Sequence, residues 1–203
     1  MIEQTPWTTH CPKPYSRLVE LEDRTSDPIA IYAERYKGPF IGLPRIQRYK
    51  EEIISEFKED SSVLFLGAGH SGNPNFIFQS SNVAELTVLD YVKEAAYGLS
   101  PGIEFIGDDF RTTNKLKTYD YVFSEHTIEH FSRDDILNIV LPKCLRVAKD
   151  AVVFVLPYGK NWSDEKSHRC LFYEDDELSA RCVRWKKIYN GQELILWFEG
   201  EAI

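Results

Sequence analysis

Long hydrophobic runs, paired cysteines and an excess of basic residues are all missing from this 203-residue sequence. No apolar run approaches the ~20 residues of a membrane-spanning helix, and the first residues do not combine a basic start with an apolar stretch. We therefore expect neither a membrane anchor nor a signal peptide. The four cysteines are scattered without Cys-x-x-Cys spacing, which argues against a disulfide framework or a cysteine zinc site. The expected protein is soluble and cytoplasmic, with reduced thiols.

The balance of charge argues against one large class of partner. Lys and Arg number 24 against 32 Asp and Glu, so the formal net charge is -8. Binding to a phosphate backbone needs a basic face, so the composition disfavours a nucleic acid and favours a small-molecule substrate. The 43% of apolar residues is ordinary for a globular protein, and the length suits one domain with a sizeable core.

Composition divides the chain near its sixtieth residue. Most of the ten prolines lie within residues 1–44, a region without a clear hydrophobic period. Residues 46–57 then place apolar side chains on one helical stripe, which predicts an amphipathic helix: Ile46, Tyr49, Ile53 and Phe57. We interpret residues 1–60 as an arm and a helix that pack on, or form a lid over, the domain built by residues 61–203.

Short apolar runs alternate with helical patterns in the rest of the chain, which is typical of an α/β fold. Five runs predict strands: residues 63–66, 86–90, 103–106, 119–124 and 151–156. The tail differs, because residues 183–189 and 193–198 flank Asn190-Gly191, the strongest hairpin signal in the sequence. Helices are predicted to begin at Asn73-Pro74 and at Ser132, and Pro142 predicts a kink or a break in the second of them.

A glycine turn follows the first of these strands. Gly67-Ala68-Gly69 continues through His-Ser to Gly72, and Asp90 closes the next strand about twenty residues further on. Glycine is required where backbone turns sharply and approaches a ligand. An acidic side chain at the tip of the adjacent strand is placed to bind ribose hydroxyls. The pattern predicts a nucleoside-containing cofactor, and its Gly-x-Gly-x-x-Gly spacing is compatible with NAD.

Two further features decide between cofactors. A second mononucleotide-binding half, expected for a dinucleotide fold, has no room before the terminal hairpin. The segments Gly107-Asp108-Asp109 and Tyr119–Phe131 are also distinctive. Together with the glycine turn they resemble the class I S-adenosylmethionine-dependent methyltransferases. The resemblance implies an α/β three-layer Rossmann-like sandwich whose seven-stranded sheet has the order 3-2-1-4-5-7-6, with strand 7 antiparallel.

The resemblance also implies a set of cofactor-binding residues: Gly67, Ala68, Gly69, Asp90, Tyr91, Asp108, Asp109, Phe110 and Glu125. In this reading the glycine turn contacts the methionine portion and the ribose, and Asp90 accepts hydrogen bonds from both ribose hydroxyls. Tyr91 lies beside the adenine, and Asp108 binds its amino group. The backbone amide of Asp109 or Phe110 meets a ring nitrogen. Glu125 faces the methionine end and the mouth of the substrate site.

One position departs from the family pattern. Family members commonly carry an acidic residue two positions before the first turn glycine, where it helps to hold the methionine amino group. Here that position is Phe65. The departure keeps open a second hypothesis, a catalytically degenerate protein that retains the fold for binding. A small NAD-dependent oxidoreductase is the third, supported only by the glycine spacing.

Three residues are candidates for a general base: Glu125, His126 and His168. Methyl transfer from a sulfonium mainly requires alignment of the acceptor and exclusion of water, and a hydroxyl acceptor also profits from a base near the methyl group. The predicted activity is transfer of a methyl group from S-adenosyl-L-methionine to a small molecule such as a sugar, a glycan precursor or another metabolite.

The segment His126-Thr-Ile-Glu129-His130 also matches His-x-x-Glu-His, the inverted zinc-protease motif. A zinc site would need a third ligand and one helix that carries both histidines. Because Ser132 is predicted to start a new helix, we expect the histidines to straddle a loop and His130 to tie that loop to neighbouring backbone. On this reading no metal is bound.

Overall fold

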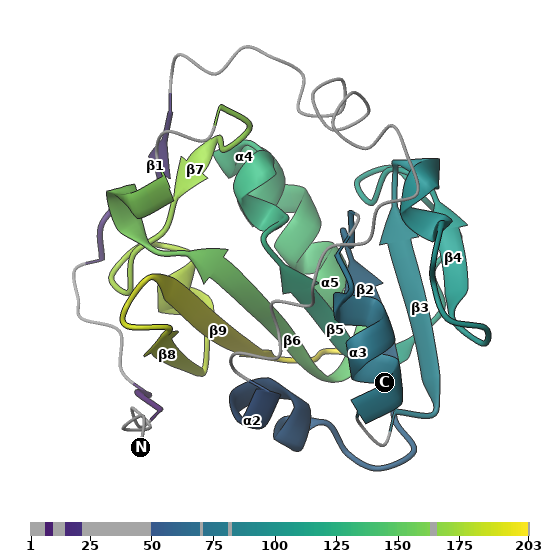
Figure 1. Ribbon diagram of the computed structural model, residues 1–203. Helices are drawn as coiled ribbons and strands as arrows, with labels where there is room; N and C mark the ends of the chain where they lie inside the picture. The colour runs from purple at the N-terminus through teal and green to yellow at the C-terminus, as the bar shows by residue number, and fades with distance from the viewer. Residues whose placement is uncertain are drawn as a thin grey trace.

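The computed structural model describes residues 7–9, 15–21, 50–69, 71–80, 83–162 and 166–202. A seven-stranded sheet forms its centre (Figure 1). Along the sheet the strands are β4 (Glu104–Gly107), β3 (Glu85–Asp90), β2 (Ser62–Leu66), β5 (Tyr119–Glu125), β6 (Ala148–Pro157), β9 (Glu193–Glu199) and β8 (Arg184–Ile188). This is the predicted order 3-2-1-4-5-7-6. The five strands from β4 to β6 are parallel, and β9 is antiparallel to both of its neighbours, as predicted.

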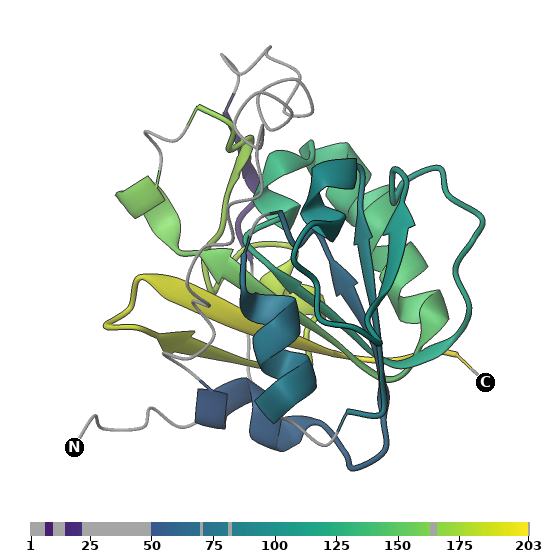
Figure 2. The same cartoon turned by 45° about the vertical axis from the view of Figure 1, so that its right-hand side comes forward.

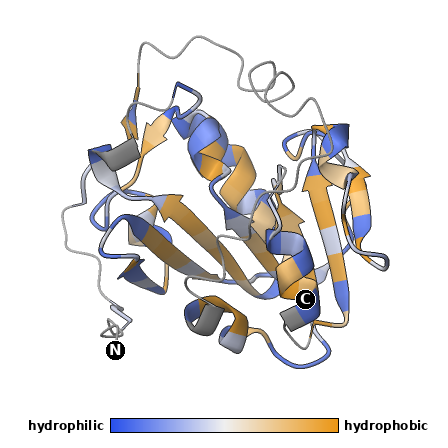
Figure 3. Cartoon of the chain, in the orientation of Figure 1, coloured by the Kyte–Doolittle hydropathy of each residue, from blue (hydrophilic) through white to orange (hydrophobic). Residues whose placement is uncertain are grey.

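Each central strand buries both of its faces, which explains why the predicted runs contain almost no polar residues. In β2, Leu64 and Leu66 belong to one apolar cluster, while Val63 and Phe65 belong to the other. The first cluster is completed by the helical segment from α4 (Arg133–Asp135) to α5 (Leu141–Val147), and the second by α2 (Lys50–Ile53) and α3 (Asn73–Ser80). Figures 2 and 3 show the resulting three layers, with apolar strands between the helices.

The helix that contains Pro142 begins where the sequence predicts, and a π-helical turn precedes the proline. The Ser132 hydroxyl oxygen accepts a hydrogen bond from the Asp135 backbone N–H at 3.1 Å, which caps α4. Residues Ile136–Val140 then form a π-helical turn before α5, whose first turn contains Pro142. Proline lacks an N–H and its ring crowds the carbonyl one turn earlier, so the wider turn relieves a clash that a regular α-helix would contain.

The N-terminal arm is described only in part, and one part lies on the domain. β1 (Val19–Glu20) pairs antiparallel with β7 (Cys170–Leu171), and Leu18 beside it is buried. The predicted helix at residues 46–57 is present as α2 and the 3-10 turn Ile54–Glu56, although its first positions lie outside the described residues. Thr8 and Ser16 also pair with the domain, through bridges to Trp185 and Asp176. The remaining residues of the arm lie outside the described ranges, so the division near residue 60 stays a prediction.

No helix among the described residues is long and apolar enough to cross a membrane. Cys144, Cys170 and Cys182 are reduced cysteines outside any disulfide, as expected, and Cys11 lies outside the described residues.

Candidate functional site

The carboxyl ends of the parallel strands bring the predicted cofactor residues to one edge of the sheet. Leu66, the last residue before the glycine turn, pairs with Leu89, and Asp90 pairs with Gly107 at the tip of β4. Glu125 ends β5 beside Val155 of β6. The backbone N–H of Asp108 donates to the carbonyl of Asp90 at 3.1 Å, which joins the tips of β3 and β4.

Asp90 is the centre of this edge. Its side chain is 6% exposed. One oxygen, Oδ2, accepts a hydrogen bond from the Gly69 N–H at 2.8 Å, and Oδ1 accepts one from the Val92 N–H at 2.9 Å. Burial raises the pKa of Asp90, and these backbone hydrogen bonds partly offset the effect. A carboxylate has about four acceptor positions, so Asp90 retains capacity for the two hydroxyls of a ribose. The residue therefore fits the role expected of it.

Gly67 makes a close contact within the protein that the sequence did not reveal. It adopts a positive φ of 72°, and a Cβ added to it would lie 2.2 Å from Cγ2 of Thr127. The Thr127 hydroxyl donates to the Gly67 carbonyl at 2.9 Å. The missing side chain at Gly67 is thus required by a side chain of the protein itself. Contact of Gly67, Ala68 and Gly69 with a cofactor stays a prediction.

The tip of β4 separates the two acidic candidates. Asp109 accepts a hydrogen bond from Arg111 Nη2 at 2.7 Å, and Arg111 also binds Asp135. Among the ion pairs of the described residues, Asp108 takes part in one, with Lys115 at 3.1 Å. The Lys115 side chain is 60% exposed. The Asp109 carboxylate is thus held by a guanidinium, which leaves Asp108 as the better candidate for the adenine amino group. Phe110 is buried in the core, so only its backbone could serve.

His126 follows the buried Glu125 and has an uncommon backbone, with a φ of 50°. Its Nδ1 lies 3.4 Å from Oε1 of Glu129, and its Nε2 lies 3.2 Å from Oε1 of Glu193. Burial opposes the charged form, but these two carboxylates outweigh it and raise the pKa of His126 to about 10. An imidazolium paired on both sides has no lone pair to take a proton, so the geometry disfavours His126 as a general base.

Glu129 is fully buried on the 3-10 turn Ile128–His130. Its Oε1 faces three imidazoles, because Nε2 of His168 is 3.7 Å away and Nε2 of His130 is 4.0 Å away, in addition to His126. Neither oxygen accepts a hydrogen bond of good geometry from the described residues. Burial works to raise the pKa of Glu129, but His126 and the charges of the imidazoles outweigh it and lower the pKa to about 2. Glu129 is therefore a buried carboxylate whose nearest polar side chains are imidazoles.

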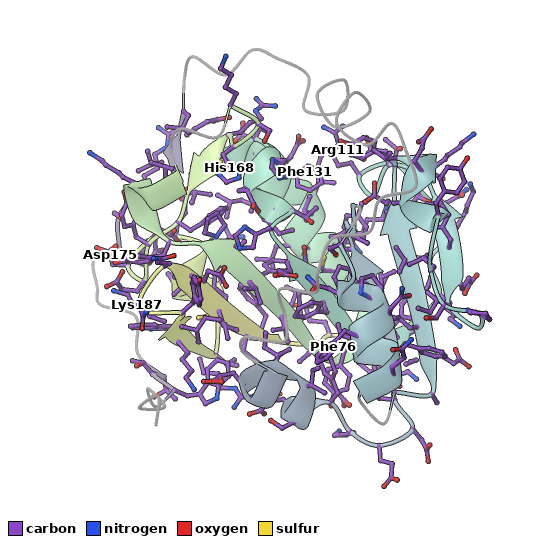
Figure 4. All side chains as sticks on the ribbon, in the orientation of Figure 1. Phe76, Arg111, Phe131, His168, Asp175 and Lys187 are labelled. Carbon is purple, nitrogen blue, oxygen red and sulfur yellow. The ribbon has the colours of Figure 1, made fainter. Side chains whose placement is uncertain are left out.

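His130 and His168 come from segments far apart in the sequence. His130 Nδ1 lies 2.9 Å from the carbonyl oxygen of Ser167, which confirms that His130 ties its loop to neighbouring backbone. The rings of His130 and His168 are 5.1 Å apart. The Arg169 N–H donates to the Glu129 carbonyl at 2.7 Å and fixes the approach of the two segments. The guanidinium of Arg111 lies over the ring of Phe131, 5.7 Å from its centre, and Figure 4 labels both residues together with His168.

No family model matches the chain, and no curated protein sequence matches it. Many solved structures do. A protein from Pyrococcus horikoshii has a TM-score of 0.63 and 18% identity, and the match covers 77% of this chain and 90% of that one. The N-methyltransferase NodS from Bradyrhizobium japonicum, in complex with S-adenosyl-L-homocysteine, has a TM-score of 0.62 and 8% identity, covering 86% and 99%. The DhpI complex with the same compound has a TM-score of 0.58 and 18% identity, covering 89% and 98%.

The chain has the fold of the class I S-adenosylmethionine-dependent methyltransferases. Identities this low show the fold and leave activity to the residues of the site.

Within this methyltransferase fold Phe65 is a core residue. It is 1% exposed, and its ring packs edge-on against Phe123 at 5.2 Å. It belongs to the apolar cluster under α2 and α3. No carboxylate can replace it without burial of a charge among apolar side chains. Glu125 is the acidic residue at the end of the neighbouring strand β5.

Sequence reasoning missed one grouping in the methyltransferase fold. The histidines at positions 126 and 130 straddle a loop, as predicted, since α4 begins only after Ser132. His168, predicted as a separate candidate, contacts Glu129 and thereby joins them. Spacing could not indicate this, because β6 lies between the two segments. The only signal was that both segments follow neighbouring strands at the same sheet edge.

Proposed function

We propose that this chain binds S-adenosylmethionine and transfers its methyl group to a small-molecule acceptor. The observation that carries the proposal is Asp90, a buried carboxylate that is held by the glycine turn and keeps acceptor capacity at the carboxyl edge of the sheet. The likeness to solved structures in complex with S-adenosyl-L-homocysteine supports it. The net charge of -8 favours a small acceptor over a nucleic acid.

The chain's part in the reaction is positioning. S-adenosylmethionine supplies a methyl group already activated on sulfur. Asp90 would orient the ribose, Asp108 the adenine, and Glu125 the end of the cofactor that faces the acceptor. Correct alignment of the methyl donor and the acceptor can supply much of the rate enhancement of a displacement reaction. A base that takes a proton from a hydroxyl acceptor increases the rate further. Glu125 and His168 stay the candidates for that base, since both lie at the same edge and are nearly buried.

Calorimetric titration of the full chain with S-adenosylmethionine, S-adenosylhomocysteine and NAD tests the proposal. We expect micromolar binding of the first two ligands and none of NAD. Asp90→Asn should weaken binding at least tenfold, because the amide removes acceptor capacity from the ribose site while it keeps the side chain's shape. Asp134→Asn, which alters an exposed carboxylate of α4, is the matched control and should bind normally.

Absence of binding for both sulfur compounds would overturn the proposal and favour the second candidate, a protein that keeps the fold without catalysis. The observation behind that candidate is Phe65, which leaves β2 without the acidic residue that the family commonly has. Tight NAD binding would instead support an oxidoreductase. The antiparallel strands β8 and β9 argue against that reading, because they stand where a second nucleotide-binding half would be.

A further inference from the structure

We propose that Glu129, His130 and His168 form a binding site for a divalent transition-metal ion. One ligand atom from each of these side chains lies within 4.8 Å of the other two. Two imidazoles and a carboxylate favour zinc and its first-row neighbours over magnesium or calcium, which prefer oxygen ligands. The inference revises the expectation from the sequence that this segment binds no metal. It concerns metal binding as such and does not depend on the proposed methyl transfer.

The distances suit a metal with a small adjustment. The Nε2 atoms of His168 and His130 lie 3.7 and 4.0 Å from Oε1 of Glu129. Ligand bonds of about 2.0–2.2 Å in a tetrahedral zinc site place the ligand atoms roughly 3.3–3.6 Å from one another. Each nitrogen must therefore move a few tenths of an ångström closer to Glu129, and the distance between the ligand atoms of His130 and His168, which is at most 4.8 Å, must shorten as well. The Arg169 N–H to Glu129 carbonyl hydrogen bond already holds the two backbone segments together.

The tautomer of His130 suits metal binding. Its Nδ1 faces the Ser167 carbonyl, and a carbonyl can only accept, so Nδ1 carries the proton. In the neutral ring the lone pair is then on Nε2, the atom that faces Glu129. A histidine whose far nitrogen donates to a backbone carbonyl while the near one binds the ion is the usual arrangement in metal sites.

The burial of the Glu129 carboxylate gives the second, independent reason. Glu129 is 0% exposed, and within the described part of the chain neither of its oxygens accepts a hydrogen bond of good geometry. A buried carboxylate is costly unless it is hydrogen-bonded, paired or bound to a metal. His126 lies 3.4 Å from Glu129, and its other nitrogen faces a second carboxylate, that of Glu193, at 3.2 Å. A divalent cation would give the buried Glu129 carboxylate a partner of its own, with His126 as a supporting contact.

The site's location suggests a use. Thr127, which packs on the glycine turn, lies between His126 and the turn that carries Glu129, so the cluster adjoins the proposed cofactor edge. Three protein ligands leave a coordination position open, and a bound cation lowers the pKa of an oxygen acid at that position. If the proposed function holds, the ion would activate a hydroxyl acceptor, and His168 would serve as a ligand and not as the base.

Metal binding is tested without any methyl donor. The full chain is stripped with a chelator and titrated with Co²⁺, whose visible absorption reports nitrogen and oxygen ligation, and with Zn²⁺ against a chromophoric chelator. We expect one equivalent of metal, a Kd below 10 µM (an order-of-magnitude expectation, about 7 kcal/mol), and a raised melting temperature. Mg²⁺ at the same concentration should leave the spectrum and the melting temperature unchanged.

Variants identify the ligands. Glu129→Gln keeps the side-chain volume and His168→Asn removes one imidazole, and each should weaken Zn²⁺ binding about 100-fold or more. Glu59→Gln alters an exposed carboxylate and is the control, with unchanged affinity expected. Circular dichroism checks that each variant folds; if Glu129→Gln does not, His168→Asn and the Co²⁺ spectrum of the native chain decide.

Two results would overturn the site. One is a folded native chain that binds no Zn²⁺ and gives no Co²⁺ band. The other is full affinity in the folded His168→Asn variant, which would place any bound metal elsewhere, for example on a cysteine. Because neither readout uses S-adenosylmethionine, failure here leaves the cofactor titration untouched, and failure of that titration leaves the metal site standing.

Discussion

Asp90 and Gly69 are joined by a hydrogen bond of 2.8 Å, in which the backbone N–H of the glycine turn donates to the carboxylate at the tip of the next strand. The other oxygen of Asp90 binds the Val92 N–H. The Asp90 side chain thus holds the glycine turn against the end of β3 and also binds the first residues of the segment that follows β3. The residue predicted to bind ribose is at the same time a structural part of the site.

This double role predicts a difference between two substitutions. Asp90→Ala leaves the N–H groups of Gly69 and Val92 without their acceptor, and we expect the free energy of unfolding to fall by about 2–4 kcal/mol. Asp90→Asn keeps one acceptor oxygen, so its cost should be about 1–2 kcal/mol. Urea denaturation measures both. Equal costs for the two variants would show that the hydrogen bonds to the turn contribute little.

Which parts of the structure could be predicted depends on how local their causes are. The strands were predictable because burial on both faces leaves an almost purely apolar run, as in Val152–Leu156, and the hairpin because Asn190 and Gly191 accept a positive φ. Asp90 was predictable because its strand ends beside the glycine strand. The contacts of Thr127 and His168 depend on segments that meet only in the folded chain. No sequence period records them.

Gly67→Ala should be strongly destabilising. The added Cβ would lie 2.2 Å from Cγ2 and 2.3 Å from Oγ1 of Thr127, and the φ of 72° is unfavourable for alanine. We expect a loss of about 3 kcal/mol or more, of which ~1 kcal/mol is backbone strain. Thermal denaturation of Gly67→Ala, Thr127→Ala and the double variant separates the terms. Thr127→Ala removes the two closest of the three clashing atoms and leaves only Cβ, at 2.8 Å, so the two costs should be less than additive. Strict additivity would contradict the proposed clash.

Asp176 predicts a dependence of stability on pH. Burial raises its pKa to about 6, although the backbone N–H groups of Ser179, Tyr173 and Leu178 donate to its carboxylate and oppose the shift. The unfolded value is about 3.9, so the folded chain binds this proton more tightly. Its stabilising contribution is complete below pH ~4 and is lost as the pH rises to about 6, by about 1.4 kcal/mol per pKa unit.

Asp176→Asn isolates this contribution, since the amide does not titrate. The amide also sets an NH₂ group against the Tyr173 N–H, at a cost of about 1–3 kcal/mol that is independent of pH. In urea denaturation, the stability of the native chain relative to this variant should therefore decrease between pH 4 and pH 6. The neighbouring Asp175→Asn serves as the control. A relative stability that is flat or that rises over this window would contradict the prediction.

Phe65 separates two explanations for the missing acidic residue in β2. If the site had lost its carboxylate by a single change, Phe65→Glu would restore cofactor binding. The structure predicts the opposite, because Phe65 is 1% exposed and packs on Phe123. A buried, unpaired carboxylate should cost at least 4 kcal/mol, roughly the sum of a lost core ring and an uncompensated charge. Phe65→Leu, which keeps the position apolar, should cost about 1–1.5 kcal/mol.

Denaturation and titration with S-adenosylhomocysteine would compare the native chain with the Phe65→Glu and Phe65→Leu variants. A folded Phe65→Glu chain that bound the ligand more tightly than the native one would mean that this position faces the cofactor and that the apolar packing of β2 is dispensable.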